Sequence, residues 1–492
     1  MIPRQVVSLK PTNAILSAVT TETLTQVSDE ARSLLPKSGP VLVVIHAPDP
    51  RRIGDRLSLV QGKATTLGRK EPTFGPAALS DARISTRHVE VRATAKQLTL
   101  EDLGSKNGTL VGRLQGAAPT PAAEGSQVTL LPGERFQIGS TLLQYNVEAP
   151  FPNAEAESFL GGISERMGRL RAQARQAASH GLPVMIVGPS GSGKERVARE
   201  LHRLSDRGAA GPFVALNCAT LSEQLAESEL FGHLRGAFTG ADKKREGLFQ
   251  AAAEGTLFLD EINSLPSALQ PKLLRAIQEG KVRPVGGTDE LACRPRILCA
   301  MNEDPAALVA SGRLRADLYA RLHGSMIVVP ALDEHPEDLG HLSHALLRRA
   351  GHPRVRLTPE LMWALLANPW PLHVRGLEQC LLASVRGGED TLGLTESVAS
   401  FLASQRDLAD RLRTEASGPA AAPDDAGTKA RKRKSPAKRP DREAMVRALE
   451  RHDGRVERVA EDFGVRRQQI YRWVQALGLE LASYRASDEG HG

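Results

Sequence analysis

A glycine-rich run in the middle of the chain has the residue types and spacing to bind the phosphates of a nucleotide. An apolar stretch at 184–187 leads into a helical pattern through Gly188-Pro189-Ser190-Gly191-Ser192-Gly193-Lys194-Glu195. Glycines let backbone N–H groups turn toward phosphate oxygens, and the helix N-terminus adds a positive dipole end. Lys194 would reach the β- and γ-phosphates, whereas Glu195 stands where Ser or Thr usually contacts magnesium. The alternative is a plain glycine-rich turn, which the flanking strand and helix disfavour.

A second motif places two carboxylates at the tip of an apolar strand, Thr256-Leu257-Phe258-Leu259-Asp260-Glu261. Asp260 would lie near a magnesium ion, and Glu261 would act as the base for an attacking water. Alone, such acids often only cap the next helix. Their position downstream of the glycine-rich run favours hydrolysis of ATP in the presence of Mg2+.

The elements that must position these motifs are predicted to form an α/β domain followed by a helical lid. Strands alternate with helical stretches from 160 to 332, which is typical of a parallel sheet wrapped by helices. Residues 333–405 have helical patterns and would form the lid. Two linkers are predicted, 149–159 and 406–440, and the second is rich in Ala, Pro, Lys and Arg and expected to be disordered.

Over 160–405 the sequence resembles the AAA+ activators of sigma-54 RNA polymerase, the bacterial enhancer-binding proteins. Besides the two motifs above, the resemblance is carried by Glu229-Leu230-Phe231-Gly232-His233 and by Gly236-Ala237-Phe238-Thr239-Gly240-Ala241. It implies a P-loop ATPase ring in which the loop 236–241 contacts sigma-54, with Phe238 and Thr239 central. Small residues permit a sharp, mobile tip, and one aromatic side chain supplies contact area. The alternative is an ordinary surface hairpin.

The same resemblance implies roles for five further residues. Asn217 matches a switch asparagine that holds the catalytic glutamate, and Asn302 matches a sensor that orients the attacking water. Arg315 and Arg321 match fingers that reach the γ-phosphate of a neighbouring subunit, so that a solitary subunit would be nearly inactive. Arg375 matches the sensor arginine of the lid. Each arginine taken alone could be a solvated surface charge.

The chain departs from the family pattern at several positions. Pro189 stands where a Glu is usual, Leu372-His373 replace Gly-Asn, and Gly376 replaces a Glu. Asp333-Glu334-His335 occupy a segment that usually carries arginines. None of these changes removes a phosphate ligand or a catalytic acid, so we expect hydrolysis to survive.

Short β-rich runs separated by turns from 40 to 148 predict a β-sandwich. Three motifs within it have the order and spacing of a forkhead-associated (FHA) domain: Leu67-Gly68-Arg69, Ile84-Ser85-Thr86-Arg87-His88 and Asp102-Leu103-Gly104-Ser105-Lys106-Asn107-Gly108-Thr109. The resemblance implies that loops at one end of the sandwich bind phosphothreonine peptides.

In that pocket Arg69 and Ser85 would hold the phosphate, and Asn107 would bind the peptide backbone. Arg87 and Lys106 are also expected to bind the phosphopeptide. Lys106 stands where Thr or Ser is more usual and would add a second charge to the pocket. Gly68 and His88 would support the loops. The alternative is an FHA fold with an empty pocket.

Residues 441–480 have the spacing of an all-α helix-turn-helix, with a first helix over 441–450, a turn at Phe463-Gly464-Val465 and a third helix over 467–477. This module resembles the Fis-type DNA reader that ends sigma-54 activators. The side chains expected to face DNA are Arg466, Arg467, Gln468, Gln469, Tyr471 and Arg472. Ile470, Val474 and Leu477 are expected in the core, and Trp473 in the core or at its edge.

The net charge of +7 is concentrated at this end, because 429–480 contains 15 Lys and Arg against 8 Asp and Glu. Such a surplus suits a polyanion such as DNA. The basic run 429–439 is either a specific arm or, as we favour, a solvated tether that adds salt-sensitive affinity.

Other features exclude some classes of protein. The longest apolar run, at 41–45, is far shorter than a membrane span, and no charged leader precedes an apolar segment, so we expect a cytoplasmic chain without membrane contact. The four cysteines lack metal-ligand spacing and are expected to be buried, reduced thiols: Cys218, Cys293, Cys299 and Cys380. No role is predicted for 1–39 or 481–492.

Together these features predict a transcriptional activator that assembles from dimers into a hexamer or heptamer. Its partners would be sigma-54 RNA polymerase, upstream promoter DNA, and a phosphothreonine protein or Ser/Thr kinase. Two alternatives stay open. One is a DNA-bound regulator whose ATPase serves only assembly, and the other is a phosphoprotein scaffold that acts without sigma-54.

Overall fold

The computed structural model divides the chain into two units, Met1–Ser417 and Gly418–Gly492. It describes residues 39–75, 77–113, 118–148, 160–220, 223–385, 390–416, 442–452, 459–460, 462–463 and 470. The predicted linker 149–159, most of the linker 406–440 and the terminal segments 1–38 and 481–492 therefore lie outside the described residues.

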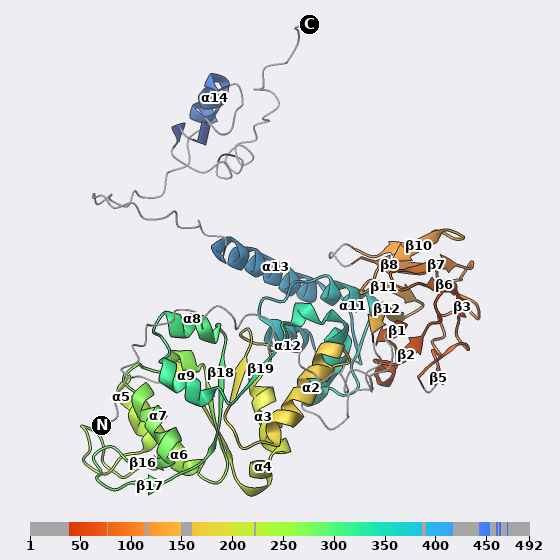
Figure 1. Cartoon of the computed structure of the whole chain (residues 1–492). Helices are drawn as coiled ribbons and strands as arrows, with labels where there is room; N and C mark the ends of the chain where they lie inside the picture. Colours follow the sequence, from red (N-terminus) through yellow and green to blue (C-terminus); the bar gives the residue numbers. More distant parts are fainter. Residues whose placement is uncertain are drawn as a thin grey trace, which may run out of the picture. The chain divides into compact units, whose positions relative to one another are not determined.

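The predicted β-sandwich is confirmed (Figure 1). One sheet has the strand order β2-β1-β12-β11-β8-β9 and the other has the order β10-β7-β6-β3. The strands are β1 (Gly39–His46), β2 (Arg56–Ser58), β3 (Ala64–Leu67), β6 (Val89–Ala93), β7 (Leu98–Asp102), β8 (Thr109–Gly112), β9 (Thr120–Pro121), β10 (Gln127–Leu130), β11 (Arg135–Ile138) and β12 (Thr141–Glu148), with a small hairpin of β4 (Thr73–Phe74) and β5 (Ala77–Ala78). Alternate residues such as Val89 and Val91 fill the core between the sheets.

The first strand of this sandwich is buried on both faces. Leu42 and Val44 belong to the core between the two sheets, whereas Val41, Val43 and Ile45 belong to a second core shared with the lid. Side chains alternate along a strand, so an uninterrupted apolar run is what burial on both faces requires.

The segment 160–332 forms the predicted α/β domain around a parallel sheet of order β14-β15-β18-β13-β19. Its strands are β13 (Val184–Val187), β14 (Phe213–Asn217), β15 (Thr256–Asp260), β18 (Arg296–Met301) and β19 (Ser325–Val328), with a separate ribbon of β16 (Lys281–Val282) and β17 (Leu291–Ala292). Its helices are α2 (Glu165–Ala178), α3 (Lys194–Leu204), α4 (Asp206–Ala210), α5 (Glu223–Phe231), α6 (Leu248–Ala251), α7 (Gln270–Glu279), α8 (Pro305–Ala310) and α9 (Ala316–Leu322).

Helices cover both faces of this sheet. On β15, Leu257 and Leu259 enter one core while Phe258 enters the other. Burial on both faces leaves the strand no room for charge until its end, where Asp260 emerges beside Asn217 of the neighbouring strand. The carboxyl ends of all five strands meet at this edge.

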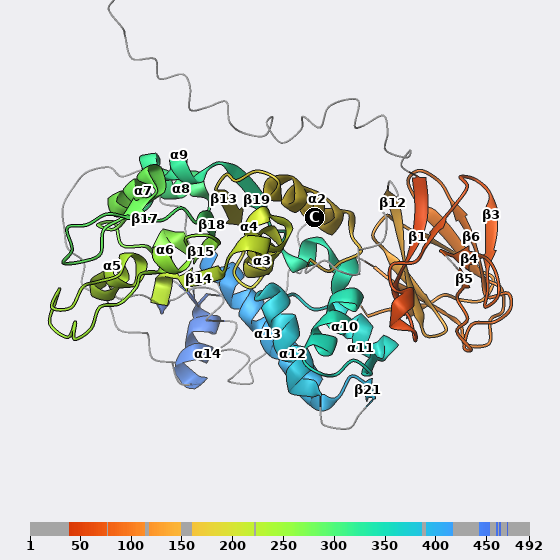
Figure 2. The same cartoon turned by 90° about the horizontal axis from the view of Figure 1, so that it is seen from below.

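The lid is built from α10 (Leu339–Arg349), α11 (Pro359–Leu366), α12 (His373–Ser384) and α13 (Glu396–Ala416), with a short parallel pair of β20 (Arg356–Leu357) and β21 (Thr391–Leu392). Figure 2 shows α10 and α11 between the sandwich and the rest of the lid. Our expected boundary at 405 is wrong, because α13 continues to Ala416. Gln405 and Ala409 are buried, and Arg406 Nε donates to Asn368 Oδ1 at 3.1 Å, so lid contacts hold the helix beyond that point.

In the C-terminal unit the structure describes α14 (Arg442–Arg451) and a few residues after it. Its core combines Met445, Ala448 and Leu449 of α14 with Val459, Ala460 and Ile470. Of the three residues expected in this core, Ile470 is described and is buried there. The helix-turn-helix as a whole stays a prediction.

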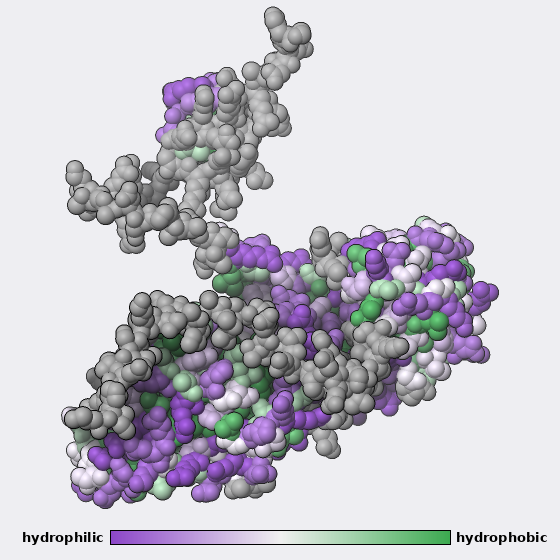
Figure 3. All heavy atoms as spheres, in the orientation of Figure 1, coloured by the Kyte–Doolittle hydropathy of each residue, from purple (hydrophilic) through white to green (hydrophobic). Residues whose placement is uncertain are grey.

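Within the described chain no helix has the length and apolar character needed to cross a membrane. On the face of these residues that Figure 3 shows, hydrophobic side chains lie in small groups among hydrophilic ones. The four cysteines are free and buried, as expected. Burial raises the pKa of Cys218 and of Cys299 to about 12, so both remain thiols at neutral pH.

The packing of the sandwich against the lid buries two histidines. Burial, together with the nearby His344, lowers the pKa of His46 in β1 to about 3. Burial, together with His341 and Arg348, lowers the pKa of His344 in α10 to about 4. Both rings are therefore neutral when folded, whereas in the unfolded chain they take up protons below about pH 6.5.

We predict that the larger unit loses stability as pH falls below 6.5, because the unfolded state then binds more protons than the folded state. At about pH 5.5 the loss should be about 1.4 kcal/mol for each histidine. Urea unfolding followed by tryptophan fluorescence at about pH 7.5 and about pH 5.5 measures it. His46→Leu should make the pH dependence shallower, and an unchanged dependence would contradict this assignment.

Candidate functional site

The glycine-rich loop joins the end of β13 to the start of α3 at the carboxyl edge of the parallel sheet. Gly191 and Gly193 have φ values of 82° and 103°, which residues with a side chain rarely adopt. The Lys194 ammonium donates to the carbonyl oxygens of Gly188 at 2.8 Å and Pro189 at 3.0 Å. The loop therefore closes over its own lysine at a helix N-terminus, which is an arrangement suited to phosphate.

A buried hydroxyl also lies in this loop. Ser192 Oγ is buried and has no hydrogen-bond partner among the described residues. Buried polar groups are normally paired, so a hydroxyl of this kind suits a ligand oxygen. The loop thus fits the phosphates of ATP.

The structure brings four predicted site residues together. Burial lowers the pKa of Lys194, Asp260 and Glu261 act to raise it, and Arg375 of the lid acts to lower it, with a net lowering. Asp260 Oδ1 accepts a hydrogen bond from the backbone N of Glu261 at 3.0 Å. Glu261 has a φ of 52°, a left-handed conformation that is unusual for this residue and that turns its side chain out of the strand direction.

The two predicted asparagines lie at the same sheet edge, Asn217 at the end of β14 and Asn302 directly after β18, with β15 between the two strands. Asn217 Oδ1 accepts from the backbone N of Ala219 at 2.8 Å, and no hydrogen bond joins Asn217 to Glu261 among the described residues. Asn302 Oδ1 lies 3.5 Å from Asn263 Nδ2, which donates to Glu303 Oε1 at 3.0 Å. Sequence reasoning missed Asn263, although it stands two residues after Glu261.

Glu195 does not join this cluster. Its carboxylate pairs with Arg199 at 2.7 Å on the outer side of α3, where both side chains are about half exposed. Among the described residues no group of three His, Cys, Asp or Glu could hold a metal ion alone. Magnesium is usually bound through one or two carboxylates together with phosphate oxygens and water, and Asp260 is the candidate carboxylate here.

Arg315 and Arg321 lie at the two ends of α9 and are exposed. Arg315 pairs with Asp317 at 2.7 Å. Arg321 lines a cavity of about 390 Å³ together with Pro183 and Arg296, which lie at the amino ends of β13 and β18. This is the sheet edge opposite Lys194, so Arg321 is directed away from the nucleotide site of its own subunit.

The lid contacts the glycine-rich loop directly. The backbone N of Arg375 donates to Gly191 O at 3.2 Å, and a Cβ on Gly191 would lie 2.3 Å from Leu372 O. His373 has a φ of 48° and accepts from the backbone N of Leu332 through Nδ1 at 3.3 Å. Histidine and asparagine are both enriched in the left-handed conformation. His373, which stands where asparagine is usual, can therefore adopt this backbone conformation.

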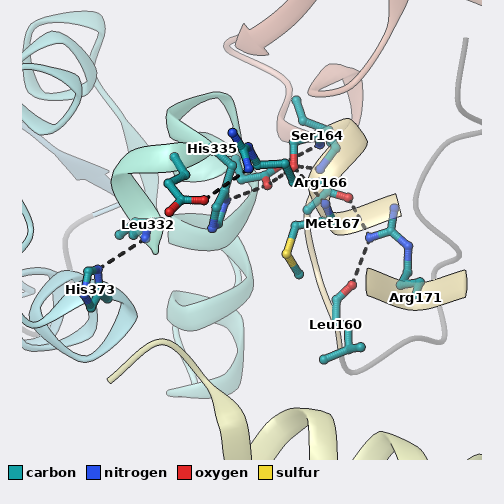
Figure 4. A network of polar contacts seen from close by, with 12 residues as sticks. Leu160, Ser164, Arg166, Met167, Arg171, Leu332, His335 and His373 are labelled. Atoms are coloured by element: carbon teal, nitrogen blue, oxygen red, sulfur yellow. Dashed lines mark hydrogen bonds and ion pairs between the residues drawn. The ribbon is translucent and has the colours of Figure 1, made fainter. Parts of the chain in front are cut away.

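The base of the lid is fixed to the start of α2 by a buried carboxylate, in the network that Figure 4 shows. Asp338 accepts from the backbone N of Ser164 at 2.8 Å, from Ser164 Oγ at 2.6 Å, and from the backbone N of Ile163. His335 Nδ1 lies 2.8 Å from Asp338 Oδ2.

Burial alone would raise the pKa of Asp338, but hydrogen bonds from His335 and Ser164 outweigh it and hold this pKa below its usual value. Burial would lower the pKa of His335, and the bond to Asp338 raises it on balance. The contact thus favours the carboxylate form of Asp338 and the protonated form of His335. His335 lies in the segment that was expected to carry arginines, and its bond to Asp338 favours its protonated form.

The loop 236–241 closes on itself. Gly236 N donates to Ala241 O at 2.8 Å, and Ala241 N donates to Phe238 O at 3.0 Å. Phe238 is 39% exposed and meets the ring of His233 edge-on, with centroids 5.0 Å apart. Bridges from His233 to Arg245 and Val285 fix the base of the loop. An exposed aromatic on a small-residue tip fits a contact surface.

The predicted phosphopeptide residues gather at one end of the sandwich. Arg69 N donates to Ser85 O at 3.1 Å, and Lys106 N donates to Ser85 Oγ at 3.1 Å. Asn107 Nδ2 donates to Arg83 O at 2.6 Å. The supporting residue His88 accepts from Ser85 N at 3.1 Å and bonds Gly108 O through Nε2 at 3.1 Å, as expected.

This end of the sandwich is basic. Arg69, Arg83, Arg87 and Lys106 are exposed, and none of them has an ion-pair partner among the described residues. Sequence reasoning missed Arg83, which lies two residues before Ser85. Uncompensated positive charge suits a phosphate group.

The residues expected to read DNA lie outside the described part of the chain: Arg466, Arg467, Gln468, Gln469, Tyr471 and Arg472.

Comparison with known families agrees with this geometry. Residues 160–328 match the family model described as the Sigma-54 interaction domain, and residues 65–139 match the model described as the FHA domain. The chain therefore contains an AAA+ P-loop domain of sigma-54 activator type and an FHA domain.

Similar proteins include transcriptional regulators. The chain is 48% identical over 226 residues to the transcriptional regulatory protein GlrR of Escherichia coli, covering 44% of this chain and 51% of that protein. It is 46% identical over 251 residues to the response regulator protein PilR of Pseudomonas aeruginosa, covering 50% of this chain and 56% of that protein. The chain thus spans about half the length of these relatives. The crystal structure of NtrX from Brucella abortus aligns at 28% identity with a TM-score of 0.45, covering 65% of this chain and 70% of that one.

The geometry of the FHA loops gives a steric prediction. A Cβ on Gly68 would lie 1.8 Å from Thr86 O, although the backbone of Gly68 is not left-handed. Gly68→Ala should therefore push the 84–88 loop outward and destabilise the FHA domain by about 1–3 kcal/mol.

Gly39→Ala is a matched control, because nothing lies within 4 Å of its added Cβ. Its effect should stay within about 0.5 kcal/mol. Thermal melting of the two variants measures the difference. Equal melting temperatures would show that the close approach at Gly68 is not real.

Proposed function

We propose that this chain is a sigma-54-dependent transcriptional activator, in which ATP hydrolysis drives the loop 236–241 against sigma-54 RNA polymerase to open promoter DNA. The observation that carries the proposal is the gathering of Lys194, Asp260, Glu261 and Arg375 at one sheet edge, in the domain that also bears this loop. A scaffold that acts without sigma-54 would need neither feature.

Each residue of the site has a distinct role in hydrolysis. Lys194 and the loop N–H groups bind the β- and γ-phosphates, and Glu261 takes the proton of the attacking water. Asn302 orients that water, and Asn263 contacts the Asn302 side chain. A magnesium ion held by Asp260 would neutralise charge on the phosphates. Asn217 adjoins Asp260 on the next strand and responds to the nucleotide state.

Hydrolysis depends on a homo-oligomer. Arg321 lines a cavity at the sheet edge opposite Lys194, and Arg315 is exposed at the start of the same helix. Both observations support a role for these arginines at the γ-phosphate of a neighbouring subunit. An arginine supplied in this way raises the rate by about 10³–10⁵. An ATPase that serves only assembly would not need the catalytic base.

The flanking modules provide regulation and promoter binding. The basic loops of the FHA domain bind a phosphothreonine protein through Arg69, Ser85, Arg87, Lys106 and Asn107. The C-terminal module binds upstream promoter DNA through its predicted third helix. Its small core of Met445, Leu449, Val459 and Ile470 supports an independent helical fold.

Glu261→Gln should bind ATP with nearly unchanged affinity and hydrolyse it at least about 100-fold more slowly, because the amide cannot accept the proton. Phosphate release and nucleotide binding measure the two properties separately. Glu195→Gln is the matched control, since that carboxylate pairs with Arg199 outside the cluster, and it should retain turnover. Normal turnover in Glu261→Gln would remove the catalytic assignment.

Thr239→Ala should retain ATPase activity and lose open-complex formation at a sigma-54 promoter, because Thr239 is exposed at the loop tip. Thr391→Ala, at an exposed threonine of the lid, should affect neither property. Transcription assays with purified polymerase measure the outcome. Normal transcription by Thr239→Ala would show that the loop does not contact the polymerase as proposed.

A further inference from the structure

The outer face of the FHA sheet is packed into the hydrophobic core of the ATPase lid. Val41, Val43 and Ile45 of β1 and Leu142 of β12 share one cluster with α10, α11 and α12. We propose that this interface is a coupling surface, through which a ligand on the FHA loops and a nucleotide on the glycine-rich loop change each other's affinity. The part that concerns the phosphopeptide rests on the function proposed above.

The two modules approach each other too closely for a loose contact. A Cβ on Gly340 of α10 would lie 2.1 Å from Ile45 O, and a Cβ on Gly112 of β8 would lie 2.3 Å from the Trp363 ring. Trp363 Nε1 donates to Gln137 Oε1 at 2.7 Å, and Arg56 donates to Ile163 O at 2.7 Å. The interface is therefore packed as a protein interior is.

On the FHA side, hydrogen bonds connect this interface to the predicted phosphate loop. Asp81 accepts from Arg83 N at 2.9 Å in the loop that carries Ser85. The same carboxylate accepts from Ser140 N at 2.6 Å and Thr141 Oγ1 at 3.1 Å, in the turn between β11 and β12. That turn lies between Gln137 and Leu142, both of which contact the lid.

On the lid side, the same core continues to the nucleotide site. Leu342 and Leu346 of α10 pack in one cluster with Leu377 and Leu381 of α12. Arg375 of α12 donates its backbone N–H to Gly191 O in the glycine-rich loop. A displacement of β1 against α10 is thus transmitted through packed side chains to the phosphate-binding loop.

The interface also contains buried polar atoms that destabilise the packed arrangement of the FHA domain and the lid. His46 Nδ1 and His344 Nε2 are buried there without a hydrogen-bond partner among the described residues. An unsatisfied buried nitrogen opposes packing, so the docked and released arrangements differ by less than the apolar area alone would give. A surface of this kind can respond to a ligand.

Gly340→Ala in the full chain tests the coupling, because alanine favours the helix while its methyl displaces β1. We expect faster amide hydrogen exchange in β1 and α10, and ADP binding weakened by about fivefold. Gly181→Ala is the matched control, since nothing lies within 4 Å of its added Cβ, and it should alter neither measurement. Gly112→Ala inserts a methyl group into the same interface from the FHA side, and it should cause the same faster exchange and weaker ADP binding.

Two outcomes overturn the proposal. Unchanged amide hydrogen exchange in both Gly340→Ala and Gly112→Ala means that the FHA domain is not docked as described. Faster exchange with unchanged ADP affinity means that it is docked without coupling.

A second measurement uses a degenerate phosphothreonine peptide library as the probe. In the wild-type chain, ADP should change capture of the library by the same factor by which the library changes ADP affinity, and Gly340→Ala should abolish both effects. Capture that ignores ADP overturns the coupling. A chain that captures no phosphopeptide refutes the FHA role in the proposed function, while the ADP and exchange measurements still decide whether the FHA domain and lid are coupled.

Discussion

The Asp338 carboxylate is the contact on which the arrangement of the larger unit depends. It is fully buried and accepts hydrogen bonds from two backbone N–H groups, a hydroxyl and the His335 ring, which join the start of α2 to the base of the lid. A buried charge without such partners would be strongly destabilising. The junction joins the α/β domain to the lid, which in turn contacts the glycine-rich loop and the FHA domain.

Hydrophobic packing extends that junction in both directions. One core runs from β1 of the FHA domain through α10 to α12, and two others cover the faces of the parallel sheet. The charged groups needed for hydrolysis emerge only where the strands end. The functional residues thus stand on rigid elements, whereas the loop 236–241 is a small-residue tip held only at its base.

The parts of this structure that the sequence predicts best are those whose chemistry depends on neighbouring residues in the chain. The glycine-rich loop needs particular φ values at Gly191 and Gly193, and the FHA loops need Gly68 against Thr86, so residue types reveal them. The apolar run 41–45 indicates a strand, whereas its burial on both faces is known only from the structure.

Features that depend on distant contacts were not predictable. Nothing near Val41 or Ile45 specifies the lid as the partner of β1, and the extension of α13 to Ala416 depends on contacts with Asn368. Glu195 was counted with the nucleotide site, but its position on α3 lets it pair with Arg199 instead. Asn263 and Arg83 carry no motif of their own, and only folding brings them beside Asn302 and Asn107.

We propose that nucleotide chemistry at the sheet edge drives an interaction of loop 236–241 with sigma-54. A binding assay between the full chain and purified sigma-54, with and without ADP–aluminium fluoride as a transition-state analogue, tests it most directly. We expect a stable complex with the analogue and none with ADP alone. Failure to bind sigma-54 with the analogue, by a chain that hydrolyses ATP, would contradict it.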